Sequence, residues 1–127
     1  MTVFALVVDD DDDIRYLTGV SLEATAGWEV VTAASGAEAL SEALARTPDV
    51  VLLDLMMPEM DGLATVERMR AEPTLVDVPV ILFTAKASVG DDAPWEGADI
   101  SGVLGKPYDP MQLAGNVRGL LGWGPER

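Results

Sequence analysis

Acidic residues stand at the ends of two apolar stretches of this sequence. Asp9 and Asp10 follow residues 4–8, and Asp54 follows residues 50–53. Two carboxylates about 4 Å apart repel each other by roughly 4 kcal/mol at an effective dielectric constant of about 20, so a site that gathers three of them needs a cation. Magnesium suits such a site, because it takes oxygen ligands and usually binds one or two carboxylates together with a phosphate. These residues therefore predict a Mg2+ site.

A hydroxyl group and an ammonium group occupy comparable positions. Thr84 directly follows the apolar residues 80–83. Lys106, one of only two lysines, lies two positions after the apolar residues 103–104. We expect Lys106 to form a salt bridge with Asp54 and to become the counter-charge of a phosphoryl group there. Asp54 would then be an aspartyl nucleophile that forms an acyl phosphate. Thr84 would donate a hydrogen bond to a phosphoryl oxygen.

These residues can meet only if the strands that carry them end at the same edge of a sheet. The apolar patterns predict strands at residues 4–8, 28–32, 50–53, 80–83 and 103–104, alternating with helices at about 14–25, from 35, after 62, at 87–97 and at 111–121. Such alternation predicts a doubly wound parallel sheet with helices on both faces. In an open sheet of this kind, ligands bind outside the carboxyl ends of the strands. Gly90 and Pro94 predict a short or irregular fourth helix.

Capping residues mark several helix ends. Gly27 predicts the end of the first helix. Ser35 and Glu38 have the spacing of a capping box at the start of the second helix. Asp109 and Pro110 predict the N-cap and first residue of the last helix.

The composition limits the class of protein. With 127 residues, of which 49% are hydrophobic and 24% charged, the chain is expected to form one globular domain at residues 1–121, followed by a tail at 122–127. It has no cysteine, no apolar run of membrane-spanning length and no signal-peptide pattern, so we expect a cytoplasmic protein. The net charge of −14 argues against direct binding of nucleic acid.

The chain resembles the receiver domain of two-component response regulators over nearly its full length. The resemblance rests on ALVVDD at 5–10, VVLLDLMMP at 50–58, MDG at 60–62, FTA at 83–85 and KP at 106–107. It implies a single, chemotaxis-regulator-like domain with a flavodoxin-like fold and strand order 2-1-3-4-5. It also implies that Asp54 receives a phosphoryl group from a phosphohistidine of a histidine kinase or phosphotransfer protein, and that the domain is a switch rather than an enzyme.

The resemblance assigns roles to individual residues. Thr84 and Lys106 would contact the phosphoryl oxygens, and the peptide bond before Pro107 would be cis. The metal would be held by Asp10, Asp54 and the backbone carbonyl of Met56, with Asp9 acting through a water molecule. An unknown downstream protein would bind the face formed by the expected fourth helix, the fifth strand and the last helix.

One position departs from the family pattern, and two others occupy sites that affect the rate of dephosphorylation in the family. Val103 stands where many members have Tyr or Phe, which puts the ring-based readout of phosphorylation in doubt. The irregular helix that contains Gly90 and Pro94 is then the element expected to move, which amide exchange across residues 85–102 would report. Neither Met56 nor Lys86 can orient an attacking water as a carboxylate or amide would. We therefore expect slow self-dephosphorylation.

Other classes of function fit less well. A haloacid-dehalogenase-type phosphatase needs a second aspartate where this chain has Met56, and five aspartates at 9–13 would repel a flavin phosphate. A receiver-like module that docks constitutively, without phosphorylation, stays open as the alternative. Asp11–Asp13 are interpreted as a helix N-terminus, and Trp28 and Trp123 as packing residues. Trp95 is left open between packing and a partner contact.

Overall fold

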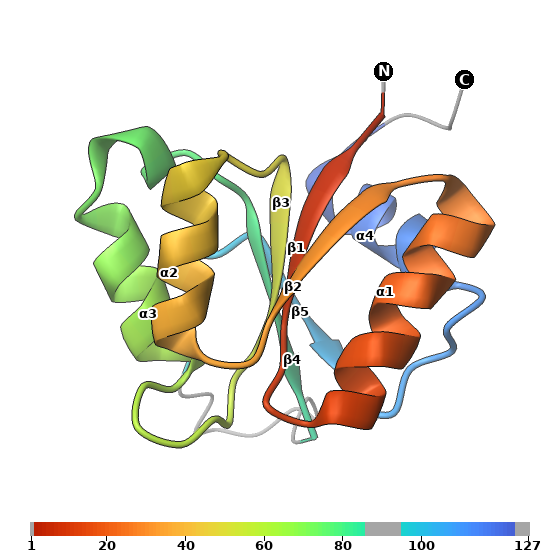
Figure 1. Ribbon diagram of the computed structural model, residues 1–127, viewed down its shortest axis with the longest axis horizontal. Coiled ribbons are helices and arrows are strands. Elements are labelled where there is room, and N and C mark those ends of the chain that lie inside the picture. Colours follow the sequence, from red (N-terminus) through yellow and green to blue (C-terminus); the bar gives the residue numbers. More distant parts are fainter. Residues whose placement is uncertain (1, 86–94, 124–127) are drawn as a thin grey trace.

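The computed structural model describes residues 2–85 and 95–123. These residues form a parallel sheet in the order β2-β1-β3-β4-β5, which confirms the predicted topology (Figure 1). The strands are β1 (Phe4–Val8), β2 (Glu29–Ala33), β3 (Val50–Asp54), β4 (Val80–Thr84) and β5 (Gly102–Gly105). Each lies within about two residues of its predicted bounds, but Asp54 and Thr84 belong to their strands as the last residue of each.

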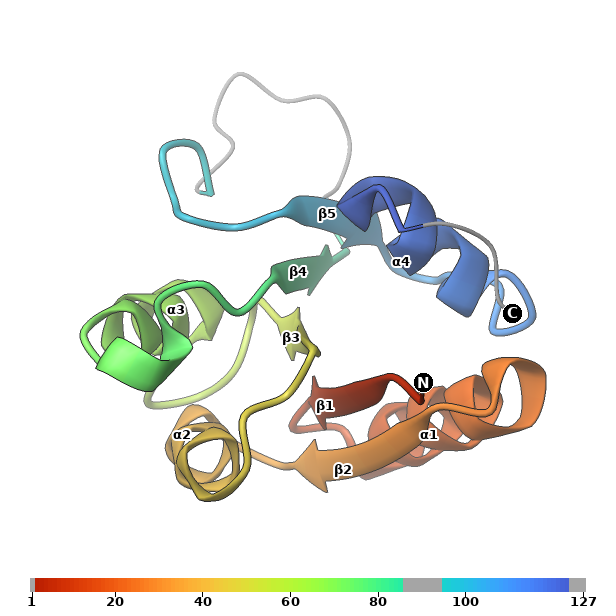
Figure 2. The ribbon, with the colours of Figure 1, turned by 90° about the horizontal axis from the view of Figure 1, so that it is seen from above.

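Helices cover both faces of the sheet. They are α1 (Asp12–Ala26), α2 (Gly36–Ala45), α3 (Gly62–Arg70) and α4 (Leu113–Leu121), with a 3-10 turn, η1 (Pro73–Leu75). Helices α2 and α3 lie on one face, and α1 and α4 lie on the other (Figure 2). The expected helix at 87–97 falls mainly on residues 86–94, outside the described residues, while residues 95–97 form a turn. None of the helices in the described ranges is long and apolar enough to cross a membrane.

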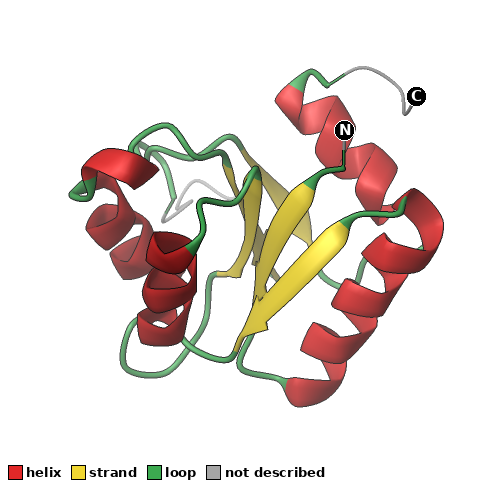
Figure 3. Cartoon of the chain, turned by 45° about the horizontal axis from the view of Figure 1, so that its top comes forward, coloured by secondary structure: helices red, strands yellow, loops and turns green. Residues whose placement is uncertain are grey.

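The unbroken apolar character of the central strands follows from this two-sided cover (Figure 3). In β1, Leu6 and Val8 pack in the core beneath α2 and α3. The alternate residues Ala5 and Val7 pack in the core beneath α1 and α4. Strands β1, β3 and β4 are buried along their whole length. They therefore give rigid support to the residues at their carboxyl ends.

Helix α1 packs differently from its apolar pattern. Leu17 and Val20, which recur at helical spacing, are 50% and 38% exposed. Small residues such as Thr18 and Gly19 are buried instead. An added Cβ at Gly19 would lie 3.4 Å from Val30 Cγ1, so the helix backbone approaches β2 closely. Small side chains permit this close contact, which leaves apolar side chains on the solvent side.

The predicted start of the last helix is wrong. Helix α4 begins at Leu113 rather than Met111, and Asp109 is not its N-cap. The Asp109 carboxylate accepts a hydrogen bond from the Met111 N–H at 2.9 Å, and its backbone carbonyl accepts one from the Gln112 N–H at 3.0 Å. Asp109 therefore closes a separate turn before the helix, as Asp side chains commonly do. By contrast, Gly27 ends α1 in the left-handed conformation with φ of 69°, as predicted.

The N-caps of α1 and α2 are aspartate and serine side chains. Asp11 accepts hydrogen bonds from the backbone of the first turn of α1, which confirms the structural interpretation of the acidic run there. Ser35 Oγ accepts a hydrogen bond from the Glu38 N–H at 3.1 Å, as predicted. The reciprocal half of the capping box is displaced, because Glu38 bonds to the N–H of Ala34, at 2.6 Å, rather than that of Ser35.

The described tryptophans take part in packing. Trp28 is buried, and its ring meets the edge of Trp123 at a centroid distance of 6.1 Å. Both belong to the core beneath α1 and α4, as predicted. Trp95 is half-buried against the core on the opposite face. Packing therefore accounts for Trp28 and Trp123, while Trp95 packs on the core and stays partly exposed.

Candidate functional site

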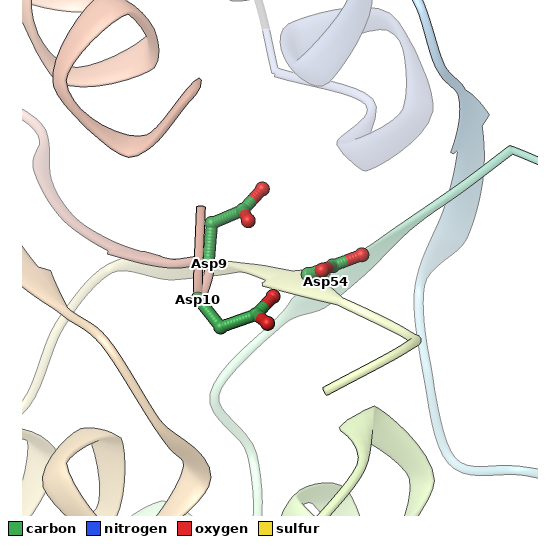
Figure 4. A group of neighbouring side chains, drawn as sticks. All are labelled: Asp9, Asp10 and Asp54. Atoms are coloured by element: carbon green, nitrogen blue, oxygen red, sulfur yellow. The ribbon is translucent and has the colours of Figure 1, made fainter. Parts of the chain in front are cut away.

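Three carboxylates meet at the carboxyl end of the sheet. Asp9 and Asp10 follow β1 directly, and Asp54 ends the neighbouring strand β3. One carboxylate oxygen from each lies within 4.8 Å of the other two (Figure 4). Asp9 and Asp54 are buried, whereas Asp10 is exposed. The structure thus brings together the three acidic residues that the sequence singled out.

Lys106 reaches this cluster from two strands away. It follows β5, and its ammonium passes the end of β4 to lie 3.3 Å from Asp54 Oδ1. Its shorter contact, 2.8 Å, is with Asp9 Oδ2. We predicted only the Asp54 pair. The second pair follows from strand order, because β1 adjoins β3 and puts both carboxylates within the radius of one lysine side chain.

The cluster perturbs the charges of its own members. Burial, followed by the negative charge of Asp9, raises the pKa of Asp54 above its usual value, although Lys106 and the Met56 backbone N–H oppose this. Burial disfavours the charged form of Lys106, but the two carboxylates outweigh it and raise the pKa of the lysine. Near neutral pH, Lys106 is therefore firmly charged. Burial and the charge of Asp9 make ionisation of Asp54 less favourable than it is in water.

Thr84 lies on the strand next to that of Asp54, and Met56 follows Asp54 by two positions in the chain. Thr84 is the buried last residue of β4 and pairs in register with Gly105, while its neighbour Phe83 pairs with Asp54. The Thr84 carbonyl accepts a hydrogen bond from the Lys106 N–H at 2.9 Å. The Met56 side chain is 72% exposed, but its backbone N–H hydrogen-bonds to the Asp54 carboxylate.

Gly62 brings the start of α3 against the acceptor strand. An added Cβ there would lie 2.7 Å from the Asp54 carbonyl oxygen and 2.9 Å from Leu55 Cα. The Gly62 N–H also donates a hydrogen bond to the Leu55 carbonyl at 2.9 Å. The contact is backbone to backbone, so only glycine fits without displacing the loop. The sequence marked this residue as part of a motif, but gave no steric reason for it.

Tyr108 is a neighbour of the site that sequence reasoning missed. Its ring stacks on Phe83 at 5.2 Å, and its hydroxyl hydrogen-bonds to Thr18 of α1. Burial, assisted by the charge of Asp9, raises the pKa of Tyr108 to about 12. The preceding Lys106–Pro107 bond is cis, as the resemblance implied. Val103, which stands where many family members have Tyr or Phe, is half-buried against the core beneath α2 and α3.

The donor set suits magnesium. All three acidic side chains offer hard oxygen ligands, and exposed Asp10 leaves one side of the cluster open to water. Opposite ligands of an octahedral Mg2+ stand about 4.2 Å apart, given bonds of about 2.1 Å. The observed oxygen spacing of up to 4.8 Å needs only small side-chain movements to reach that geometry. The cluster therefore fits Mg2+ with the remaining positions taken by water or phosphate.

Comparisons with known proteins agree with this geometry. Residues 5–118 match the family model described as the response regulator receiver domain. The transcriptional regulatory protein PrrA of Mycobacterium tuberculosis is 40% identical over 116 residues, and the DNA-binding dual master transcriptional regulator RpaA of Synechocystis is 34% identical over the same length. Each match covers 91% of this chain but 48% of the relative. The chain thus spans about half the length of these curated relatives.

Solved structures show the same fold over their whole length. The chemotaxis response regulator CheY4 of Vibrio cholerae superimposes with a TM-score of 0.87 at 31% identity, covering 94% of this chain and 99% of that one. A putative response regulator from Chloroflexus aurantiacus gives a TM-score of 0.85 at 31% identity, covering 96% and 99%.

Proposed function

Because this chain belongs to the response regulator receiver domain family, we propose that it accepts a phosphoryl group on Asp54 and thereby switches between two states. The observation that supports this best is the buried Asp54 carboxylate at the end of β3, flanked by two further carboxylates and 3.3 Å from the Lys106 ammonium. An Asp54 oxygen attacks the phosphorus of a phosphohistidine. The new O–P bond forms as the N–P bond breaks, which gives an acyl phosphate.

The surrounding residues hold the transferred group. Lys106 moves part of its hydrogen bonding from the carboxylates to a phosphoryl oxygen, and the Thr84 hydroxyl donates to another. Thr84 ends β4, which adjoins the Asp54 strand β3, and Lys106 follows β5, which adjoins β4. The proposed protein ligands of Mg2+ are Asp10, Asp54 and the Met56 backbone carbonyl. When bound, Mg2+ supplies positive charge that stabilises the transferring phosphoryl oxygens.

Asp9 has a different part in this site. Its Oδ1 accepts a hydrogen bond from the Asp11 N–H at 2.9 Å, and its Oδ2 accepts one from Lys106 at 2.8 Å. Both carboxylate oxygens are therefore already engaged by the protein. We propose that Asp9 acts on the metal through a water molecule rather than as a direct ligand.

Receiver domains interact with sensor kinases or phosphotransfer proteins, and we propose such a protein as the phosphoryl donor here. The receiver domain would span residues 1–121, with 122–127 as a tail. A downstream protein would read the change at the face of β5 and α4, together with the 87–97 segment. The net charge of −14 argues against direct nucleic acid binding by the residues of this chain.

Intact-mass measurement tests the proposal. A small phosphodonor with Mg2+ should add one phosphoryl group to the wild type and none to Asp54→Asn. Asp61→Asn is the matched control, because Asp61 lies in the same β3–α3 loop, is exposed, and caps α3 through the Ala64 N–H, which asparagine can also do. It should be phosphorylated like the wild type. If the wild type takes up no phosphoryl group, the protein is a constitutively docking module instead.

A further inference from the structure

Asp9, in the loop between β1 and α1, is held by hydrogen bonds to four other residues. Its N–H donates to the Ala33 carbonyl at the end of β2, at 3.1 Å. Its carboxylate oxygens bond to the Asp11 N–H and to Lys106. Its backbone carbonyl accepts from Arg15 Nη1 at 2.8 Å. Among the described residues, Arg15 is the one donor recorded for that carbonyl.

Arg15 projects from the first turns of α1 back onto this loop. Its side chain is 19% exposed, so most of it is covered. The second guanidinium nitrogen, Nη2, bonds to Asp12 Oδ1 at 2.5 Å. The Asp12 side chain is 85% exposed, so that ion pair contributes little by itself. The contact that matters for the site is the one with the Asp9 carbonyl.

We infer that Arg15 is a positioning residue, which holds the β1–α1 loop so that Asp10 stays within metal-binding reach of Asp54 and Asp9 stays beside them. This inference rests on the proposed function, because it concerns the same site. The carbonyl of Asp9 and the nitrogen of Asp10 belong to one planar peptide unit. A hydrogen bond that fixes the Asp9 carbonyl therefore also fixes the backbone from which the Asp10 side chain leaves.

The charge of the loop makes such a restraint necessary. Residues 9–13 carry five successive carboxylates, and two of them face Asp54. Repulsion favours an open loop when no cation is bound. Arg15 opposes this by giving a charged donor to the loop backbone on one side, while Lys106 holds the Asp9 carboxylate on the other. Partners hydrogen-bonded to metal ligands typically change metal affinity by about 10–100-fold when mutated. Arg15 acts one step further away, on the backbone that carries Asp10, so we expect an effect at the lower end of that range.

Titration with MgCl2, followed by calorimetry and by backbone amide NMR signals of residues 9–13, tests the inference. Arg15→Met keeps the aliphatic stem but removes the donors and the charge, and should weaken Mg2+ binding about 10-fold. Arg15→Lys keeps the charge and a donor, and should recover part of the loss. Asp12→Asn is the matched control. It removes the exposed ion pair but leaves the contact with the Asp9 carbonyl, so its affinity should stay within about twofold of wild type.

Urea unfolding of the same variants separates positioning from a merely structural role. A structural role would lower the stability of Arg15→Met without changing its Mg2+ affinity, and that result would overturn the inference. If Arg15→Met does not fold, Arg15→Lys decides: an affinity equal to wild type sinks the idea, and a reduced affinity supports it. The titration needs no phosphodonor. A wild type that binds Mg2+ but is never phosphorylated would therefore defeat the proposed function alone, whereas a wild type that binds no Mg2+ would defeat this inference.

Discussion

Replacing Lys106 with methionine removes the cation between two buried carboxylates while keeping an unbranched side chain of nearly the same length. The Asp9 and Asp54 side chains are only 5% and 8% exposed, and the ammonium lies 2.8 Å and 3.3 Å from them. Removing one partner of such a buried pair costs about 3–5 kcal/mol, because the remaining charge is left without compensation. We expect Lys106→Met to lose a free energy of unfolding of this size at pH 7 in the absence of Mg2+.

The loss should shrink as the pH falls. Lys106 opposes the increase in the pKa of Asp54, so its removal raises that pKa further above the value in the unfolded chain. At pH values between the pKa of Asp54 in the unfolded chain and its higher pKa in the folded variant, the folded state binds more protons than the unfolded state. The stability of the variant therefore falls as the pH rises through this range. Lys106 itself, with a raised pKa, contributes stability that is lost only in the alkaline range. The variant should thus regain stability between pH 7 and pH 5 more steeply than the wild type.

Urea unfolding, followed by tryptophan fluorescence to which buried Trp28 contributes, measures both effects. Arg46→Met is the matched control, since Arg46 pairs with Glu29 at 2.6 Å, but both side chains are more than half exposed. That variant should lose much less stability than Lys106→Met and show no added pH dependence in this range. A Lys106→Met protein as stable as Arg46→Met at pH 7, with the same pH profile, would refute the electrostatic reasoning.

Three further outcomes follow from the site. Gly62→Ala should destabilise the protein by about 1–3 kcal/mol in urea and slow phosphorylation, because its Cβ would lie 2.7 Å from the Asp54 carbonyl oxygen; unchanged values would mean that the loop yields freely. Tyr108→Phe should cost about 1 kcal/mol, measured in the same way, by removing the hydrogen bond to Thr18 while keeping the stacked ring. Phosphorylated protein should decay slowly in an intact-mass time course, because exposed Met56 cannot orient a water; a lifetime of seconds would contradict this.

The strand ends of this fold are well predicted from sequence, whereas contacts that depend on side-chain reach are not. Asp9 and Asp54 were placed together because apolar strands of a parallel sheet end at one edge. The pairing of Lys106 with Asp9 depends on how far one flexible side chain extends past β4, which no periodicity encodes. The stack of Tyr108 on Phe83 depends equally on the path of the loop after β5.

Helix faces and ends were predicted less well, for related reasons. Leu17 recurs with Val20 at the spacing of one helix face, which usually marks the buried side. Both are exposed here, and the close approach at Gly19 places small residues inward instead. Asp109 was assigned as an N-cap because its type favours both caps and turns, and the structure uses it for a turn. Lys86, one of the two positions expected to set the lifetime of the acyl phosphate, lies outside the described residues.

The hydrogen bonds of the site indicate where a charge change at Asp54 acts first. A phosphoryl group on Asp54 competes for Lys106, and Lys106 is also bonded to Asp9. Asp9 is in turn bonded to the end of β2 and to Arg15 of α1. The network therefore leads from the acceptor to the β1–α1 loop through charged groups in direct contact. Val103 offers no ring for the usual route through β5, so we expect the β1–α1 side to carry more of the response here than in receivers with an aromatic residue at that position.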